Sequence, residues 1–373
     1  MKLINIFLSL ILFYSLNTTY AHADINKIIN LANNGDAHSQ FILGAIYSQG
    51  EGVPQNYTKA FEWYHKAAEQ GNIYAQHNLG TMYKEGKGVP QNYAKAFEWY
   101  HKAAEQGNER SEFLLGVMYA NGQGVPQNYI QAIEWYSKAA EKDVADAQLS
   151  LGIIYEMGRG TSQNYIKAFE LFSKSAKQGN VYAQYLLGNM YYFGKGIPQN
   201  YAQAFEWHSK AAEQGNVYAQ YSIGNMYENG EGVSKDLTKA FEWYEKSAIQ
   251  GNSDAQYSIG NMYENGEGVS KDLAKAFEWY EKSAIQGNSD AQNNLGMLYA
   301  NGKYVNKNIA LSNDWLLKAA KQGNSMAQFN IGRNYLNGDN GLPKNKAVAL
   351  MWLKKAAKNG HAQAELLFDG LYP

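Results

Sequence analysis

The sequence predicts an all-α protein, an α-solenoid of about nine helix–loop–helix repeats of 36 residues each. Three observations support this fold class. A Leu-Gly or Ile-Gly pair returns at steps of 36 residues, each period holds two segments with one apolar helical face, and a glycine-rich loop separates the two segments. The glycines of these pairs are Gly44, Gly80, Gly116, Gly152, Gly188, Gly224, Gly260, Gly296 and Gly332.

The period divides the chain into nine units, called repeats one to nine below. They span residues 36–71, 72–107, 108–143, 144–179, 180–215, 216–251, 252–287, 288–323 and 324–360. A single helix pair cannot bury its own apolar faces, so stacked pairs are expected to share one continuous core. Segments 24–35 and 361–373 resemble only part of a repeat, and each is expected to cap one end, the second as a capping helix and tail.

Repeat two shows the pattern of the elements. Residues 72–84 are expected to form a first helix, with apolar side chains at 75, 79, 82 and 83 on one face. The loop 85–92 contains two glycines and a proline. Residues 93–106 are expected to form the second helix, which Gly107 ends.

The glycine in the middle of each first helix needs an explanation, because glycine there costs about 1 kcal/mol relative to alanine. Its recurrence in all nine repeats indicates that the second helix approaches too closely for a Cβ atom. In repeat two, Ala96 and Ala103 are expected to form the surface that faces Gly80.

The first 23 residues have the pattern of a signal peptide. Lys2 precedes an apolar run over residues 3–16, and Ala21-His22-Ala23 matches an A-x-A cleavage site, so the mature chain is expected to begin at Asp24. The apolar run is shorter than the roughly 20 residues needed to span a bilayer. We therefore expect an exported protein, periplasmic or secreted, with no stable membrane insertion after cleavage. The chain has no cysteine, which excludes disulfides.

The repeats resemble the Sel-1-like repeat, a relative of the tetratricopeptide repeat. In repeat two the resemblance rests on Ala75-Gln76, Leu79-Gly80, Tyr83, Gly86, Gly88, Ala96, Trp99-Tyr100 and Ala103-Ala104. It covers about residues 24–370 and implies a right-handed superhelix that serves as an adaptor in protein complexes. Exported bacterial relatives suggest envelope complexes, host contact or virulence. Some cysteine-rich relatives carry penicillin-binding or β-lactamase labels, which this cysteine-free chain has no basis to inherit.

The sequence contains no recognisable catalytic or cofactor motif. There is no H-E-x-x-H, G-x-S-x-G, P-loop, S-x-x-K or K-T-G sequence. The seven histidines are expected on the solvated surface, the repeated tryptophans in packing, and the acidic loops 228–232 and 264–268 as turns rather than calcium sites. The net charge of −1, without a basic tract, gives no reason to expect nucleic-acid binding. We predict a non-enzyme without metal or cofactor.

The face of the first helix that varies between repeats is the candidate binding surface. In related solenoids the first helices line the concave side, and repeats five to seven carry tyrosines and asparagines there. The candidate residues are Tyr182, Tyr185, Asn189, Tyr218, Tyr221, Asn225, Asp254, Tyr257 and Asn261. Tyrosine offers contact area at low entropic cost, and asparagine can hydrogen-bond an extended backbone. The alternative is that Tyr185, Tyr221 and Tyr257 are partly buried between adjacent first helices.

These observations predict a non-catalytic scaffold that holds a protein or peptide in the concave groove. Two alternatives remain open at this point. One is a hydrolase acting on envelope polymers or β-lactams, and the other is a carbohydrate-binding solenoid, because a groove lined by tyrosines also suits sugar rings.

Overall fold

The computed structural model describes residues 22–302 and 304–371, and within these ranges the chain forms twenty helices and no strand. Residues 1–21, most of the expected signal peptide, lie outside the described residues. The helices at the two ends, where the sequence predicts caps, are α2 (His22–Asn33) and α21 (Ala362–Leu371). Among the described residues, no helix has the length and apolar character needed to cross a membrane.

Each repeat consists of two helices, as predicted. The first helices are α3 (Ala37–Gln49), α5 (Ile73–Glu85), α7 (Glu109–Asn121), α9 (Ala145–Met157), α11 (Val181–Phe193), α13 (Val217–Asn229), α15 (Ser253–Asn265), α17 (Ser289–Asn301) and α19 (Ser325–Asn337). The second helices are α4 (Tyr57–Glu69), α6 (Tyr93–Glu105), α8 (Tyr129–Glu141), α10 (Tyr165–Lys177), α12 (Tyr201–Glu213), α14 (Leu237–Ile249), α16 (Leu273–Ile285), α18 (Ile309–Lys321) and α20 (Lys346–Lys358).

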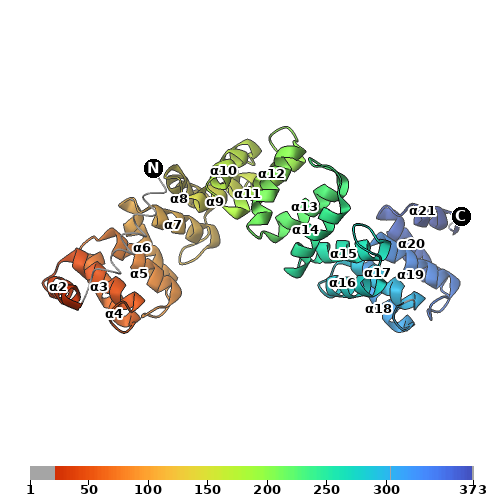
Figure 1. Ribbon diagram of the computed structural model, residues 1–373, viewed down its shortest axis with the longest axis horizontal. Coiled ribbons are helices and arrows are strands. Elements are labelled where there is room, and N and C mark those ends of the chain that lie inside the picture. The colour runs from red at the N-terminus through yellow and green to blue at the C-terminus, as the bar shows by residue number, and fades with distance from the viewer. Residues whose placement is uncertain (1–21, 303, 372–373) are drawn as a thin grey trace. The chain divides into compact units, whose positions relative to one another are not determined.

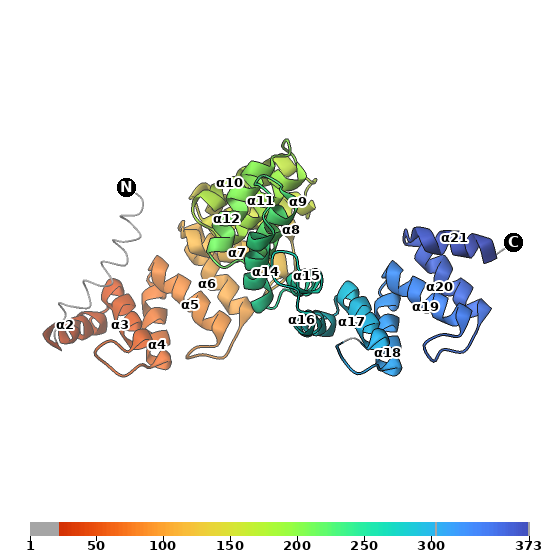
Figure 2. The ribbon, with the colours of Figure 1, turned by 45° about the vertical axis from the view of Figure 1, so that its right-hand side comes forward.

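The chain divides into two compact units, Met1–Ala183 and Gln184–Pro373, with the boundary inside α11. Within each unit the helices pack mainly against their neighbours along the chain, as Figures 1 and 2 show for α3 to α6 and for α17 to α20. The observed fold is the predicted stack of helix pairs, because each helix buries its apolar face against the helices before and after it.

Side-chain caps explain where the helices begin. Asn72 Oδ1 accepts a hydrogen bond of 2.9 Å from the Ala75 amide at the start of α5, and Asn92 Oδ1 accepts one of 3.0 Å from the Lys95 amide at the start of α6. In repeat four the start of α9 differs, because Val144 caps it without a side-chain bond and Asp143 takes the left-handed φ of 62° that glycine has elsewhere.

The close approach at the mid-helix glycine is confirmed, but the expected partner was wrong. A Cβ atom on Gly80 would lie 2.5 Å from Cδ1 of Tyr100, so the ring of Tyr100, not Ala96 or Ala103, faces the glycine. We call the residue at this position of each second helix the glycine-facing residue. The set is Tyr64, Tyr100, Tyr136, Phe172, His208, Tyr244, Tyr280, Leu316 and Leu353.

The prediction that the histidines lie on the solvated surface was wrong for two of them. His208 is the glycine-facing residue of repeat five and is only 1% exposed. His77 lies on α5, where its Nδ1 is 2.9 Å from the Ser111 hydroxyl. Burial lowers the pKa of each imidazole to about 4, with the charges of Arg110 and Lys84 adding to the effect at His77.

Buried glutamines connect successive helices. On α5, Gln76 Nε2 donates to the Ala68 carbonyl of α4 at 3.1 Å, and Gln76 Oε1 accepts from Gln106 Nε2, after α6, at 2.7 Å. Repeat three replaces this pair by Glu112 and Lys142, whose charged groups are 2.5 Å apart. The glutamine pair satisfies polar atoms that the stacking of the helices buries, whereas in repeat three Glu112 Oε1 is paired and Glu112 Oε2 is buried without a hydrogen-bond partner among the described residues.

The tryptophans of the second helices pack as expected. Trp135 is 7% exposed and belongs to the core between α6, α7 and α8. Others are half-buried and carry a lysine of the same helix over the ring, as with Lys102, whose Nζ is 4.1 Å from the Trp99 ring centroid.

Candidate protein-binding surface

The predicted site residues occupy three positions of the first helices, the second, fifth and ninth. In α13 these are Tyr218, Tyr221 and Asn225, which lie three and then four residues apart and so share one helical face. The equivalent residues on α15 are Asp254, Tyr257 and Asn261. On α11, Tyr182 belongs to the first compact unit, whereas Tyr185 and Asn189 belong to the second.

The tyrosines at the second position are exposed to solvent. Tyr218 is 54% exposed and Tyr182 is 63% exposed, and Tyr74 in repeat two is exposed in the same way. At this position repeat seven has Asp254, whose Oδ1 accepts a hydrogen bond of 2.9 Å from Nδ2 of Asn288, the residue that caps α17. In repeats five to seven, the second position therefore presents two aromatic rings and one carboxylate to the solvent.

The tyrosines at the fifth position are half-buried against their own repeat. The ring centroids of Tyr221 and Tyr244 are 5.6 Å apart, and those of Tyr257 and Tyr280 are 6.0 Å apart. Tyr185 packs in the same way on His208, at 5.6 Å. These rings rest on the glycine-facing residue of their own second helix, which fixes their orientation.

One tyrosine pair also joins two successive first helices. The ring of Tyr185 lies 5.9 Å from the ring of Tyr218 on the next first helix, with an angle of 33° between the planes. Tyr218 is the exposed member of this pair and Tyr185 is half-buried. The exposed ring is thereby backed by a second ring that the core holds in place, an arrangement that suits a rigid binding anchor.

Two of the asparagines at the ninth position already have partners inside the fold. The Tyr244 hydroxyl lies 2.6 Å from Asn225 Oδ1 and donates to Glu228 Oε2 at 2.5 Å. The Tyr280 hydroxyl makes the same pair of contacts with Asn261 and Glu264, both at 2.6 Å. In repeat five the position of these tyrosines belongs to His208, so Asn189 has no such partner there.

The sequence reasoning missed the role of the acidic residues at the end of α13 and α15. The sequence places Glu228 and Glu264 in acidic loops, whereas in the structure each binds a buried tyrosine hydroxyl. The signal was present in the repeats, because glutamate stands sixteen residues before a glycine-facing tyrosine in repeats six and seven. Within the described residues, no cluster of three or more His, Cys, Asp or Glu side chains is arranged to hold a metal ion.

The solved structures similar to this chain include two that align over most of it. One is a protective antigen present in uropathogenic Escherichia coli strains, with 41% identity, a TM-score of 0.87, and coverage of 92% of this chain and 74% of that one. The other is a Sel1 repeat protein from Oxalobacter formigenes, with 34% identity, a TM-score of 0.65, and coverage of 86% and 93%. No curated protein matches the chain.

The profile of the Sel1 repeat matches the chain nine times. The matched segments are residues 37–72, 73–108, 110–144, 145–180, 181–216, 217–252, 253–288, 289–324 and 325–361. Proteins with this repeat commonly mediate protein–protein interactions and are generally non-catalytic. With nine matches in register over helix pairs of the same period, this chain belongs to the Sel1 repeat family.

Proposed function

We propose that this chain is a non-catalytic scaffold that binds a protein or peptide through the first helices of repeats six and seven. The observation that carries the proposal is the exposed ring of Tyr218, supported by the half-buried ring of Tyr185. Tyr221 and Tyr257 extend the same face, and each is fixed by a tyrosine beneath it. Aromatic side chains held in this way lose little entropy when a partner covers them.

The test begins with a partner captured by the mature protein from envelope or host lysates. We expect Tyr218→Ala to weaken binding of that partner at least tenfold, because truncating an interface anchor costs about 2 kcal/mol or more. The matched control is Tyr74→Ala, which removes an equally exposed tyrosine from the same position of repeat two. Calorimetry on folded variants measures both, with circular dichroism to verify helicity.

Three measurements distinguish this proposal from the alternatives. Equal binding by Tyr218→Ala and the parent would contradict the assignment of the surface. Competition by soluble glycans but not by peptides would favour the carbohydrate-binding alternative. Turnover of peptidoglycan or a β-lactam by the purified protein would contradict the non-catalytic part of the proposal.

We further propose that the protein acts outside the cytoplasm, in the periplasm or after secretion, in envelope complexes or host contact. The support is the signal-like pattern of residues 1–23, together with the similarity to a protective antigen of uropathogenic bacteria. We expect exported material to begin at Asp24 because cleavage follows Ala23 in the A-x-A pattern. N-terminal sequencing of that material checks this, and an intact chain retained in the membrane would refute it.

A further inference from the structure

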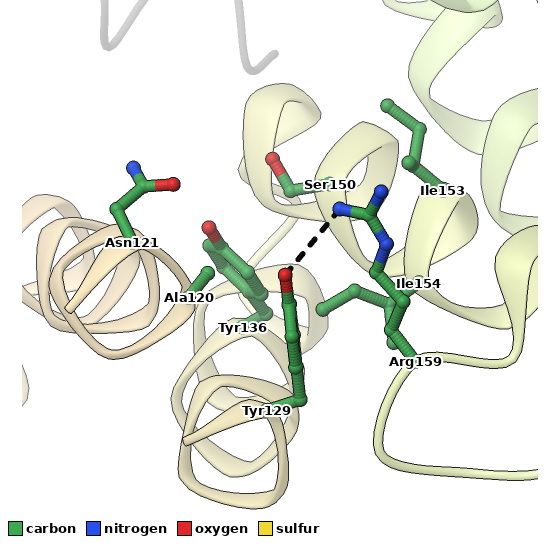
Figure 3. Close-up of a pocket in the computed structure, with 8 residues that line it drawn as sticks. All are labelled: Ala120, Asn121, Tyr129, Tyr136, Ser150, Ile153, Ile154 and Arg159. Carbon is green, nitrogen blue, oxygen red and sulfur yellow. Dashed lines mark hydrogen bonds between the residues drawn. The ribbon is translucent and has the colours of Figure 1, made fainter. Parts of the chain in front are cut away.

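Repeats three and four enclose an open recess of about 170 Å³ within the first compact unit (Figure 3). It lies where the end of α7 and the helices α8 and α9 meet. The lining residues are Ala120, Asn121, Tyr129, Tyr136, Ser150, Ile153, Ile154 and Arg159. Among these eight residues, Arg159 is the one that carries a charge.

Hydrogen-bonding groups gather at one side of this recess. Arg159 Nη1 donates to the Tyr129 hydroxyl at 3.4 Å, and the Ser150 hydroxyl is a hydrogen-bonding neighbour of the Tyr136 hydroxyl. Figure 3 shows the three hydroxyls and the guanidinium facing a common space, with Ile154 beside them. Burial raises the pKa of Tyr136 to about 12, so its hydroxyl keeps its proton and can donate at neutral pH.

Repeats six and seven show what occupies this space elsewhere in the chain. The glycine-facing tyrosines there, Tyr244 and Tyr280, donate to the carboxylates of Glu228 and Glu264. Three repeats before repeat six, 108 residues earlier, Tyr136 is retained but the glutamate position holds Ala120. The asparagine position of repeat six, Asn225, likewise holds an apolar residue in repeat three, Val117.

In repeat six, Asn225 and Glu228 of the first helix contact the Tyr244 hydroxyl. The first helix of repeat three has no polar side chain at either of these positions to contact the buried Tyr136 hydroxyl. Ser150, which corresponds to Ser258 in repeat seven, remains beside it. A recess stands where the two carboxylate oxygens of a glutamate would be. The missing group is an anion that accepts hydrogen bonds.

The charge at the rim is reversed in the same comparison. Arg159 occupies the position that Glu267 has in repeat seven, 108 residues later. Beside Tyr244, for which the chain supplies Glu228, this position is acidic, and beside Tyr136, for which the chain supplies no such carboxylate, it is a guanidinium. The planar fork of arginine binds carboxylates with two parallel hydrogen bonds.

We propose that this recess binds a carboxylate group of a ligand, which takes the place that Glu228 fills in repeat six. Tyr136 and Arg159 are the donors, and Ile153 and Ile154 cover the methylene groups behind the carboxylate. A C-terminal carboxylate and an acidic side chain share this chemistry. The proposal does not rest on the tyrosine surface of the second unit, and small probes test it without any captured partner.

The experiment uses the full mature chain and follows its arginine side chains by NMR. The chain has three arginines, Arg110, Arg159 and Arg333, so the Nε–Hε spectrum is simple and Arg159→Gln assigns the signal of interest. The probes are N-acetylalanine for a C-terminal carboxylate, N-acetylglutamate α-amide for a side-chain carboxylate, and N-acetylglutamine amide as the neutral isostere. We expect at least one carboxylate probe, but not the neutral one, to shift the Arg159 signal saturably.

The decisive variant is Ala120→Glu, which restores the internal carboxylate of repeats six and seven. It should keep the helical fold and weaken probe binding at least tenfold, because the new side chain fills the recess and bonds Tyr136. The matched control is Ala300→Glu, which adds the same charge at the same position of repeat eight, where the glycine-facing residue is Leu316. That control should bind the probes as the parent does.

Several outcomes would overturn the proposal. One is the absence of a saturable shift of the Arg159 signal up to about 50 mM probe, a concentration well above the millimolar dissociation constant expected of a single small group. The others are an equal shift of that signal by the neutral probe, and probe binding by folded Ala120→Glu that is as tight as in the parent. If Ala120→Glu loses helicity, Arg159→Gln replaces it, with the methyl signals of Ile153 and Ile154 as the readout. Retained binding in Arg159→Gln would then contradict the assignment.

Discussion

Gly224→Val is expected to destabilise repeat six by about 3 kcal/mol, the upper end of the cost of overpacking a core. A Cβ atom on Gly224 would lie 2.5 Å from both Cδ1 and Cε1 of Tyr244, whose side chain is fully buried. The ring cannot swing away cheaply, because its hydroxyl is held by Asn225 and Glu228. The better helix propensity of valine recovers only a few tenths of a kcal/mol.

Urea denaturation of the parent and the variant measures this effect. Lys239→Ala is the comparison, because Lys239 is exposed and makes only weak contacts, with Asp236 at 3.7 Å and with the Tyr227 ring centroid at 5.4 Å, so its loss should cost less than about 1 kcal/mol. A second test is the double variant with Tyr244→Ala, which removes the ring that valine would strike. The cost of Gly224→Val should shrink in that background. An unchanged cost would mean that contact with Tyr244 is not the cause.

The fold could be predicted from the sequence alone because the same pattern of helix, glycine-rich loop and helix recurs nine times. The recurrence of Gly80 and its equivalents indicated close packing, which the structure confirms. It did not indicate which side chain fills the gap, because Ala96, Tyr100 and Ala103 all lie on the buried side of one helix. Periodicity identifies a face, whereas the side chain that crosses to the next helix depends on tertiary packing.

His208 shows a different limit. Histidine as a residue type predicts a surface position, whereas the position of His208 matches that of the buried Tyr244 one repeat later. Comparing positions across repeats, rather than residue types, would have identified it as a core residue. The recess near Arg159 could have been found in the same way, from Ala120 standing where Glu228 does.

The exposure of the candidate residues could be predicted only in part. Tyr218 and Tyr221 share a helical face, and the sequence left open whether Tyr221 is partly buried between adjacent first helices; the structure exposes Tyr218 and half-buries Tyr221. Tyr221 packs on the ring of Tyr244 in the second helix of its own repeat, a contact that the spacing of three residues does not reveal. The hydrogen bonds of Asn225 and Asn261 were also hidden, since they join residues nineteen positions apart.

The stability of the second compact unit should fall as the pH drops below about 6.5, and His208 is the main cause that the structure identifies. The imidazole is buried on α12, beneath Gly188 and beside the ring of Tyr185, and its Nδ1 has no hydrogen-bond partner in the described part of the chain. Burial lowers its pKa to about 4, whereas an unfolded chain has the ordinary value of 6.5. No neighbouring charge contributes to this shift.

The direction in which the free energy of unfolding changes with pH depends on which state, folded or unfolded, binds the proton at His208. Above pH 6.5 neither state is protonated at His208, and the stability is fully present. Between pH 6.5 and pH 4, His208 binds a proton in the unfolded chain but stays neutral in the folded chain, so the free energy of unfolding declines as the pH falls. Below pH 4 the loss reaches roughly 3 kcal/mol, since each unit of pKa difference corresponds to about 1.4 kcal/mol.

His208→Phe tests this account, because repeat four carries Phe172 at the same position, fully buried against Gly152. Urea midpoints of the second compact unit between pH 4 and pH 7 should decline less steeply in the variant than in the parent, whereas His77, whose pKa is lowered in the same direction, lies in the first unit and should leave this slope unchanged. His65→Gln is the control, because that side chain is 36% exposed on α4, and it should keep the slope of the parent. If the urea midpoint of His208→Phe changed with pH as steeply as that of the parent, the buried imidazole would not be the cause of the acid sensitivity. Carboxylates or other histidines would then be the cause.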